Sequence, residues 1–295
     1  MRLIAFLVVG NSSDVLAGCI EHHRALGVDE FVILHIHSDD DTPQQLERLS
    51  RGSRSIHTVF ASWEEAMTVS TYDLLLDRIR NELSPDWIVR FDGDERWLVS
   101  DGTLKEALDQ VGSDVVTAPR YNAVWPSEAA ARHVGGHVLS ADDLPLAAYP
   151  VAVDFAHRDI VDVIPWVLTK VGPKSCIRAG ATNIGFDTGG HYGVDQISRR
   201  QVPGVSCPNV MVAQLAFTVR ERFERKLRVL GSRWAVLRQG WSQAEGWHWD
   251  RLAQIYRQGD DAIRAEWDKQ FMTPALAREL VGREVIINAT DAFGV

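Results

Sequence analysis

The segment DWIVRFDGDE, residues 86–95, decides the fold. Residues 87–91 are mostly apolar, which predicts a short buried strand, and the chain then runs directly into Asp92, Asp94 and Glu95. Ions such as Mg²⁺ and Mn²⁺ take oxygen ligands and are typically held by one or two carboxylates plus phosphate oxygens of a substrate. Gly93 allows a tight turn between the two aspartates. The pattern indicates an ion-binding turn at the end of a strand, with a solvated Asp-Gly turn as the equally weighted alternative.

Strands and helices alternate on the N-terminal side of this segment. Apolar runs predict strands at residues 3–9, 31–34 and 56–60. Helical spacing of apolar residues predicts helices between and after them, at residues 15–26, 43–49 and 66–83. Such alternation predicts a parallel sheet with helices on both faces, in which ligands bind at the carboxyl ends of the strands. We therefore expect the acidic turn to lie at the ligand-binding edge.

The rest of the chain has a different pattern. Residues 115–119 predict a further strand, whereas residues 121–159 mix Gly, Pro, Asp and His without clear periodicity and are expected to face a substrate. Residues 219–237 and 249–271 have apolar residues at helical spacing. This spacing predicts a helical C-terminal extension.

Composition excludes several classes of protein. The 295 residues are 45% hydrophobic, enough for a packed core, so a disordered or fibrous chain is excluded. Lys and Arg total 31 against 40 for Asp and Glu, and no basic run offers a surface for nucleic acid. Cys19, Cys176 and Cys207 share no short spacing, which argues against disulfides and zinc. No stretch approaches the roughly 20 apolar residues of a membrane span, so we expect a soluble, cytoplasmic protein.

Four blocks resemble glycosyltransferases of the GT-A fold, in particular the family-two-like enzymes. The stretch "DWIVRFDGDERWLV" is similar to their Asp-x-Asp block. The other blocks follow in the family's order: "NSSDVLAGCIEHHRALGVDEFVILHIHSDDDT" from Asn11, "KSCIRAGATNIGFDTGGH" from Lys174 to His191, and "RERFERK" from Arg220. The sequence departs from the family pattern at three places, where Ser12 replaces Glu, His35 replaces Asp and Ala216-Phe217 replaces His-Tyr.

The resemblance implies a fold and an activity. The fold is α/β, a Rossmann-like GT-A domain with a mixed sheet flanked by helices over residues 1–230, and a helical C-terminal extension over residues 231–295 packed on it. The activity is a metal-dependent transfer of a sugar from a nucleoside-diphosphate donor, with a UDP-sugar favoured, to an acceptor hydroxyl, with inversion. The implied cofactor is Mn²⁺ or Mg²⁺, and the acceptor is a small molecule or glycan. The oligomeric state is left open.

The resemblance also implies roles for individual residues. The metal ligands are Asp92, Asp94 and His191, since neutral imidazole suits Mn²⁺-type ions. Donor binding falls to Asn11, His35, Asp40, Asp92, Gly93, Lys174, Arg178 and Arg220. An inverting transfer needs a carboxylate that takes the proton of the acceptor hydroxyl. Among the carboxylates between the acidic turn and His191, we favour Asp154 or Asp187 for this catalytic role.

Two other functions fit the same fold. One is a catalytically silent protein that binds a nucleotide sugar or carbohydrate, which the departures at Ser12, His35 and Ala216 favour. The other is a sugar nucleotidyltransferase, although such enzymes open with a Gly-rich, Arg-containing loop that "VVGNSSDVL" lacks. The sequence also has no Gly-x-Gly-x-x-Gly, no phosphate-binding loop ending in Gly-Lys-Ser/Thr and no Gly-x-Ser-x-Gly. Dehydrogenases, P-loop enzymes and α/β-hydrolases are therefore disfavoured.

Overall fold

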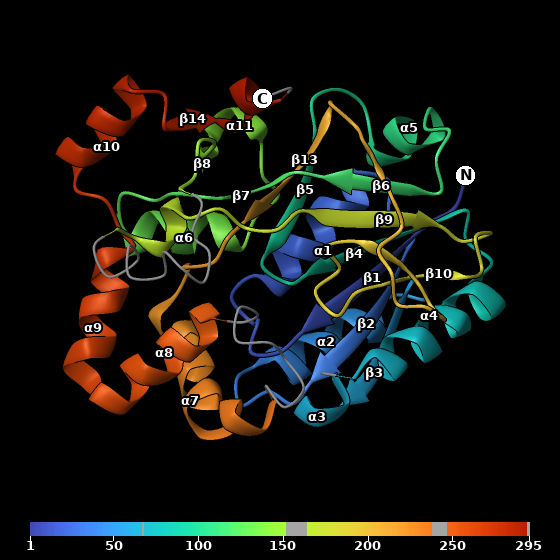
Figure 1. Ribbon diagram of the computed structural model, residues 1–295, viewed down its shortest axis with the longest axis horizontal. Helices are drawn as coiled ribbons and strands as arrows, with labels where there is room; N and C mark the ends of the chain where they lie inside the picture. The colour runs from blue at the N-terminus through green and yellow to red at the C-terminus, as the bar shows by residue number, and fades with distance from the viewer. Residues whose placement is uncertain (67, 152–163, 238–246, 294–295) are drawn as a thin grey trace.

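A computed structural model describes residues 1–66, 68–151, 164–237 and 247–293 (Figure 1). Its centre is a seven-stranded sheet. The strand order is β12 (Val205–Ser206), β6 (Val115–Ala118), β9 (Lys174–Arg178), β4 (Trp87–Asp92), β1 (Leu3–Val9), β2 (Glu30–Ile36) and β3 (Ile56–Ala61). Strands β1 to β4 are parallel, whereas β9 is antiparallel to both β4 and β6. The predicted mixed sheet with a parallel N-terminal half is confirmed.

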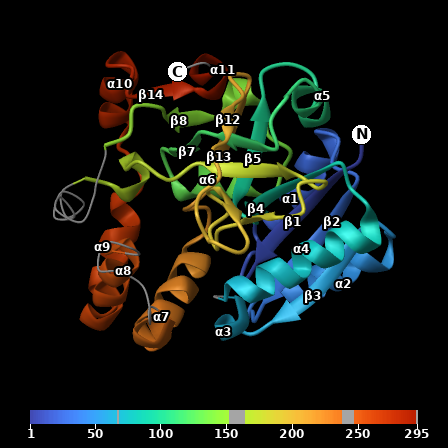
Figure 2. The same ribbon diagram turned by 45° about the vertical axis from the view of Figure 1, so that its right-hand side comes forward.

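Helices cover both faces of this sheet because successive side chains of a strand point to opposite faces. Along β1, the odd-numbered residues from Leu3 to Val9 pack on one face, together with α1, α2 and α5. The even-numbered residues pack on the other face against α4, and Figure 2 shows α4 running along this part of the sheet. These helices are α1 (Leu16–Ala25), α2 (Thr42–Arg51), α3 (Trp63–Ala66), α4 (Val69–Leu83) and α5 (Leu104–Asp109).

A three-stranded sheet continues from the acidic turn. Its order is β5 (Glu95–Val99), β13 (Val210–Gln214) and β7 (Arg120–Asn122), so the turn at residues 92–95 joins the two sheets. The remaining pairs are β10 (Ile184–Phe186) with β11 (Gly193–Asp195) and β8 (Pro145–Ala147) with β14 (Ile286–Asn288).

The middle of the chain contains a helix that its sequence does not predict. Helix α6 covers Glu128–Gly135, where the sequence has no clear helical period. The side chain of Ser127 accepts a hydrogen bond from the backbone N–H of Ala130 at 3.3 Å, which caps the first turn. The cap explains where this helix begins. Among the described residues of this part of the chain, 3₁₀ turns cover Ala141–Asp143 and Trp166–Leu168.

Helices form the C-terminal part of the chain, as predicted, and Figure 1 shows them on the side away from the N-terminus. They are α7 (Arg220–Leu237), α8 (Trp247–Gln258), α9 (Asp260–Lys269), α10 (Pro274–Gly282) and α11 (Ala289–Ala292). The predicted stretch 249–271 is divided between α8 and α9, because Gly259 has a φ of 93° that breaks the helix. Helix α7 runs across residue 230, where we expected the domain boundary. No helix in the described part is long and apolar enough to span a membrane.

Candidate active site

The acidic turn lies at the carboxyl end of β4, next to the end of β1. Asp92 is in register with Val8, and the backbone N–H of Gly93 donates to the carbonyl of Val8 at 3.2 Å. A Cβ at Gly93 would lie 3.2 Å from Ser12 Oγ and 3.3 Å from Val9 Cγ1. A side chain at this position would therefore force the loop after β1 to shift by a few tenths of an ångström, so glycine suits the close approach of the turn to this loop.

A fully buried lysine joins the first and last carboxylates of the turn. Lys174 Nζ lies 2.8 Å from Asp92 Oδ2 and 3.0 Å from Glu95 Oε2, and it donates to the carbonyl of Gly189 at 2.7 Å. Arg90 Nη1 approaches the other oxygen of Asp92 at 3.0 Å. Burial raises the pKa of Asp92, but the charges of Lys174 and Arg90 outweigh it and hold this pKa far below its usual range. Asp92 is therefore ionised at neutral pH.

The other two carboxylates of the site are also paired. Arg120 forms an ion pair with Glu95, whose side chain is completely buried. Arg222 Nη1 lies 3.0 Å from Asp94 Oδ2, and its Nε lies 3.4 Å from Asp14 Oδ2. Arg222, near the start of α7, thus joins the acidic turn to the loop before α1.

His191 reaches the same site from the loop between β10 and β11. Its Nδ1 lies 2.8 Å from the carbonyl oxygen of Pro173, which only accepts, so Nδ1 carries the proton and Nε2 has the lone pair. Burial, followed by the charges of Lys174 and Arg120, lowers the pKa of His191 to about 4. Asp187 accepts from the backbone N–H of His191 at 2.6 Å and so shapes this loop.

The three predicted metal ligands do not form a metal site as they are placed. Across the described residues, no three His, Cys, Asp or Glu side chains are grouped so that they could hold an ion. Asp92 and Asp94 each face a lysine or arginine instead. A Cβ at Gly189 would lie 2.3 Å from His191 Nε2 and 2.4 Å from its Cδ2, so the imidazole packs closely against Gly189. The residues therefore do not fit Mn²⁺ or Mg²⁺ unless an ion pair is displaced.

Three predicted nucleotide-binding residues lie together at the ends of β1 and β2. The Oγ of Ser38 accepts from the backbone N–H of Asn11 at 2.9 Å and lies 3.0 Å from His35 Nε2. Asp40 accepts from the Oγ of Ser13 at 2.7 Å. Because β1 lies between β2 and β4 and the three strands are parallel, this loop network lies at the same carboxyl ends of the strands as the acidic turn.

Other predicted residues lie elsewhere. Arg178 is in register with Trp87, the first residue of β4, and its guanidinium lies 4.6 Å from the centre of the Trp87 ring system. It is thus at the opposite edge of the sheet from Asp92, and this geometry removes Arg178 from the candidate site. Arg220 pairs with Glu224 on its own helix at 2.6 Å. Asp154 lies outside the described residues.

The C-terminal helices bring further polar and aromatic groups to the site. Burial, followed by the charges of Lys226, Arg120 and His191, lowers the pKa of His248 on α8 to about 3. Desolvation lowers the pKa of Lys226 on α7, against the attraction of Asp94 and then Asp92. The Lys226 Nζ lies 5.7 Å from the centre of the Trp249 ring system. Helices α7 and α8 therefore form one side of the site.

The sequence alone does not identify three of the charged residues that build the site. These are Arg90, Arg120 and Arg222. Arg90 lies two residues before the Asp-x-Asp pattern and Arg222 lies inside the "RERFERK" block, so proximity to a motif was the available signal. Arg120 lies outside the four blocks.

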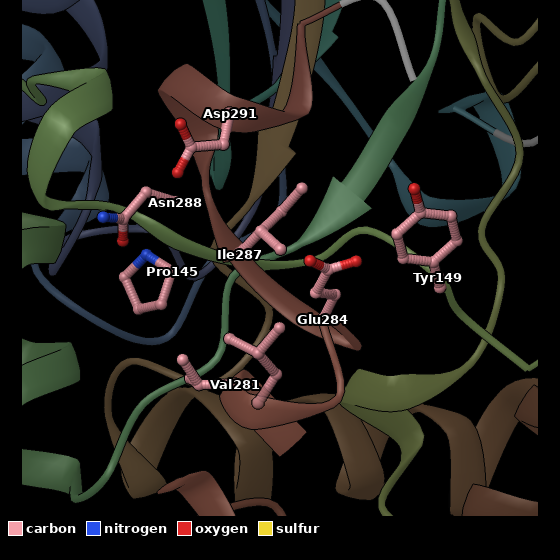
Figure 3. Close-up of a pocket in the computed structure, with 8 residues that line it drawn as sticks. Pro145, Tyr149, Val281, Glu284, Ile287, Asn288 and Asp291 are labelled. Carbon is pink, nitrogen blue, oxygen red and sulfur yellow. The ribbon is translucent and has the colours of Figure 1, made fainter. Parts of the chain in front are cut away.

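A separate hollow lies between β8 and the C-terminal segment. This cavity has a volume of about 450 Å³, and none of the predicted site residues lines it. Figure 3 shows Glu284 with Tyr149 to one side and Asn288 and Asp291 to the other. The hollow is thus distinct in its residues from the acidic turn at the end of β4.

Comparison with known proteins gives structural matches only. No protein-family model and no curated protein sequence matches the chain. Among solved structures, S. aureus TarS has 15% identity and a TM-score of 0.41 over 85% of this chain, which spans 42% of TarS. TarS 1–349 in complex with UDP has 14% identity and a TM-score of 0.38, over 86% of this chain and 70% of that one. The mannosyltransferase PcManGT from Pyrobaculum calidifontis, in complex with GDP-Man and Mn²⁺, has 13% identity and a TM-score of 0.39. This match covers 96% of this chain and 80% of PcManGT. Identity this low transfers no residue role to this chain.

Proposed function

We propose that this protein is a glycosyltransferase that moves a sugar from a nucleoside-diphosphate donor to an acceptor hydroxyl. The observation that carries the proposal is the arrangement at the carboxyl edge of the parallel strands. The acidic turn at Asp92–Glu95 lies beside the loop network of Asn11, His35 and Asp40, and cations surround the turn. Ligands of open α/β sheets bind at this edge, and a departing diphosphate needs positive charge.

The proposed transfer balances as a displacement at the anomeric carbon. The acceptor oxygen forms a bond to this carbon while the bond to the diphosphate oxygen breaks, and the acceptor proton passes to a carboxylate. Cations around the acidic turn stabilise the charge that builds on the leaving diphosphate. A UDP-sugar donor and inversion follow from the family resemblance and belong to this proposal, as does a small-molecule or glycan acceptor. Mn²⁺ or Mg²⁺, with Asp92, Asp94 and His191 as ligands, would first have to displace Lys174, Arg90 or Arg222.

Asp187 is the proposed base, with Asp154 as the second candidate. One oxygen of Asp187 accepts from the backbone N–H groups of His191 and Tyr192, at 2.6 and 2.9 Å. These bonds hold the carboxylate within the loop that carries His191. Asp187→Asn keeps an oxygen that accepts both bonds, so the loop should hold while the base is lost. We expect transfer to fall by about 10²-fold or more with unchanged nucleotide affinity. An equal loss of nucleotide affinity would point to a structural role.

The test of the function is calorimetric titration of UDP, GDP and dTDP, followed by donor-sugar turnover. One nucleoside diphosphate should bind more tightly than the others, and the matching sugar donor should be transferred or slowly hydrolysed. Tight binding without turnover over a broad set of acceptors would favour the silent binding protein. The absence of binding by all three nucleotides would contradict the proposal.

A further inference from the structure

The acidic turn is surrounded by more positive than negative charge. Four carboxylates lie in the acidic turn or share a cation with it: Asp14, Asp92, Asp94 and Glu95. Six cations face them or share a helix face with one that does: Arg90, Arg96, Arg120, Lys174, Arg222 and Lys226. With the histidines neutral, this group of side chains has a formal charge of plus two, and Asp40 and Asp187 bring the sum for the wider site to zero. The cations therefore balance the carboxylates of the site before any metal ion is added.

Most of these cations are already committed to protein partners. Lys174 is completely buried between Asp92 and Glu95, and Arg222 bridges Asp94 and Asp14. Arg96 is completely buried too, and it donates to four backbone carbonyl oxygens. These groups set the shape and potential of the site but are poorly placed to leave their partners for a ligand.

Lys226 differs from the other cations. Among the described residues no carboxylate forms an ion pair with it, and its side chain still reaches solvent. It follows Arg222 by four residues on α7, so the two side chains share one face of the helix. Arg222 pairs with Asp94 at 3.0 Å, so the helix face that Lys226 shares with it is the one turned toward the acidic turn. Lys226 is thus a cation held beside the turn by helix packing, with its donors available.

We infer that Lys226 binds the diphosphate of the donor directly, beside Arg222, so that nucleotide binding by this protein needs no divalent ion. The inference rests on the proposed function and deepens it. Mn²⁺ or Mg²⁺ would supply positive charge next to the phosphates. Here α7 supplies that charge, and the carboxylates that would hold the ion instead hold Lys174 and Arg222 in position.

The test compares binding with and without metal. The nucleoside diphosphate that binds wild type is titrated in EDTA and in Mn²⁺, and we expect the two affinities to agree within about threefold. In EDTA, Lys226→Met should lower the affinity for this nucleotide by about tenfold or more, since a hydrogen bond to a charged group is lost. The matching nucleoside without phosphates should bind both proteins equally. Lys226→Arg should restore most of the affinity.

Lys105→Met is the matched control. Lys105 pairs with Asp29 at 2.6 Å, next to Leu3 at the amino end of β1 and away from the acidic turn. Its replacement should leave nucleotide affinity within about twofold, because no contact to the site is lost. Binding that appears only with Mn²⁺ would overturn the inference, as would unchanged affinity in folded Lys226→Met. If wild type binds no nucleotide under either condition, the proposed function itself fails.

Discussion

Lys174 and Arg178 stand at the two ends of β9 and have opposite surroundings. Lys174 is completely buried and bonds two carboxylates and a backbone carbonyl. Arg178 is 37% exposed, stacks on Trp87 and donates to the backbone carbonyl of Val111 at 2.5 Å. They are four residues apart on the strand, or roughly 13 Å, so they lie at opposite ends of it. Lys174 therefore contacts the candidate active site, whereas Arg178, a cation of the same sequence block, contacts residues outside it.

The largest expected effect is at the Lys174 end. Lys174→Met leaves Asp92 and Glu95 with one cationic partner fewer in a buried site, and removal of one partner of a buried pair costs about 3–5 kcal/mol. We expect the free energy of unfolding to fall by that amount in urea at pH 7. Lys105→Met is the control, because Lys105 pairs with Asp29 at 2.6 Å near the surface and should cost less than about 1 kcal/mol. Equal losses in the two variants would remove the distinction.

Arg96 separates the effect of burial from that of the partner. Like Arg178 it donates to backbone carbonyls, but like Lys174 it is completely buried. Its bonds of 2.9 to 3.1 Å hold Gly93 and Glu95 of the acidic turn, Val15 and Gly135. We expect Arg96→Met to lower the free energy of unfolding by roughly 2–4 kcal/mol, since several buried carbonyls lose their donor. If Arg96→Met lowers the free energy of unfolding no more than a substitution at an exposed site does, burial does not explain why Lys174 and Arg178 differ in their contribution to stability.

The Lys174 end should also carry acid sensitivity. His191 has a pKa of about 4 in the folded protein against 6.5 for the free side chain, so the unfolded chain takes up a proton first as the pH falls. The stability contribution of His191 is complete above pH 6.5 and is lost progressively down to pH 4. Between pH 7 and pH 5, wild type should therefore lose about 1–2 kcal/mol more than His191→Asn, measured by urea unfolding. Parallel pH profiles would contradict the buried, neutral imidazole.

The sequence predicts the helices and strands that depend on a local pattern of apolar residues. The apolar run before Asp92, the alternating strands and helices of the first hundred residues and the C-terminal helices all follow from periodicity. It did not reach the ion pairs, because these join distant parts of the chain. Asp92 and Lys174 are 82 residues apart and Asp94 and Arg222 are 128 apart, so neither pair has a local signal. The predicted metal site rests on the acidic spacing and on the family resemblance, and neither of these shows the cationic partners of Asp92 and Asp94.

The smallest expected effect is at the Arg178 end. Arg178→Met loses the stacking on Trp87 and hydrogen bonds to the backbone, at a side chain that is partly solvated. Contacts of this kind at exposed sites are worth about 1 kcal/mol or less, which sets the expected loss in urea unfolding. Nucleotide affinity should stay within about twofold of wild type, because the opposite edge of the sheet holds the acidic turn. A loss of nucleotide affinity in this folded variant would mean that the nucleotide contacts both ends of β9. The conclusion that only the Lys174 end belongs to the candidate active site would then be wrong.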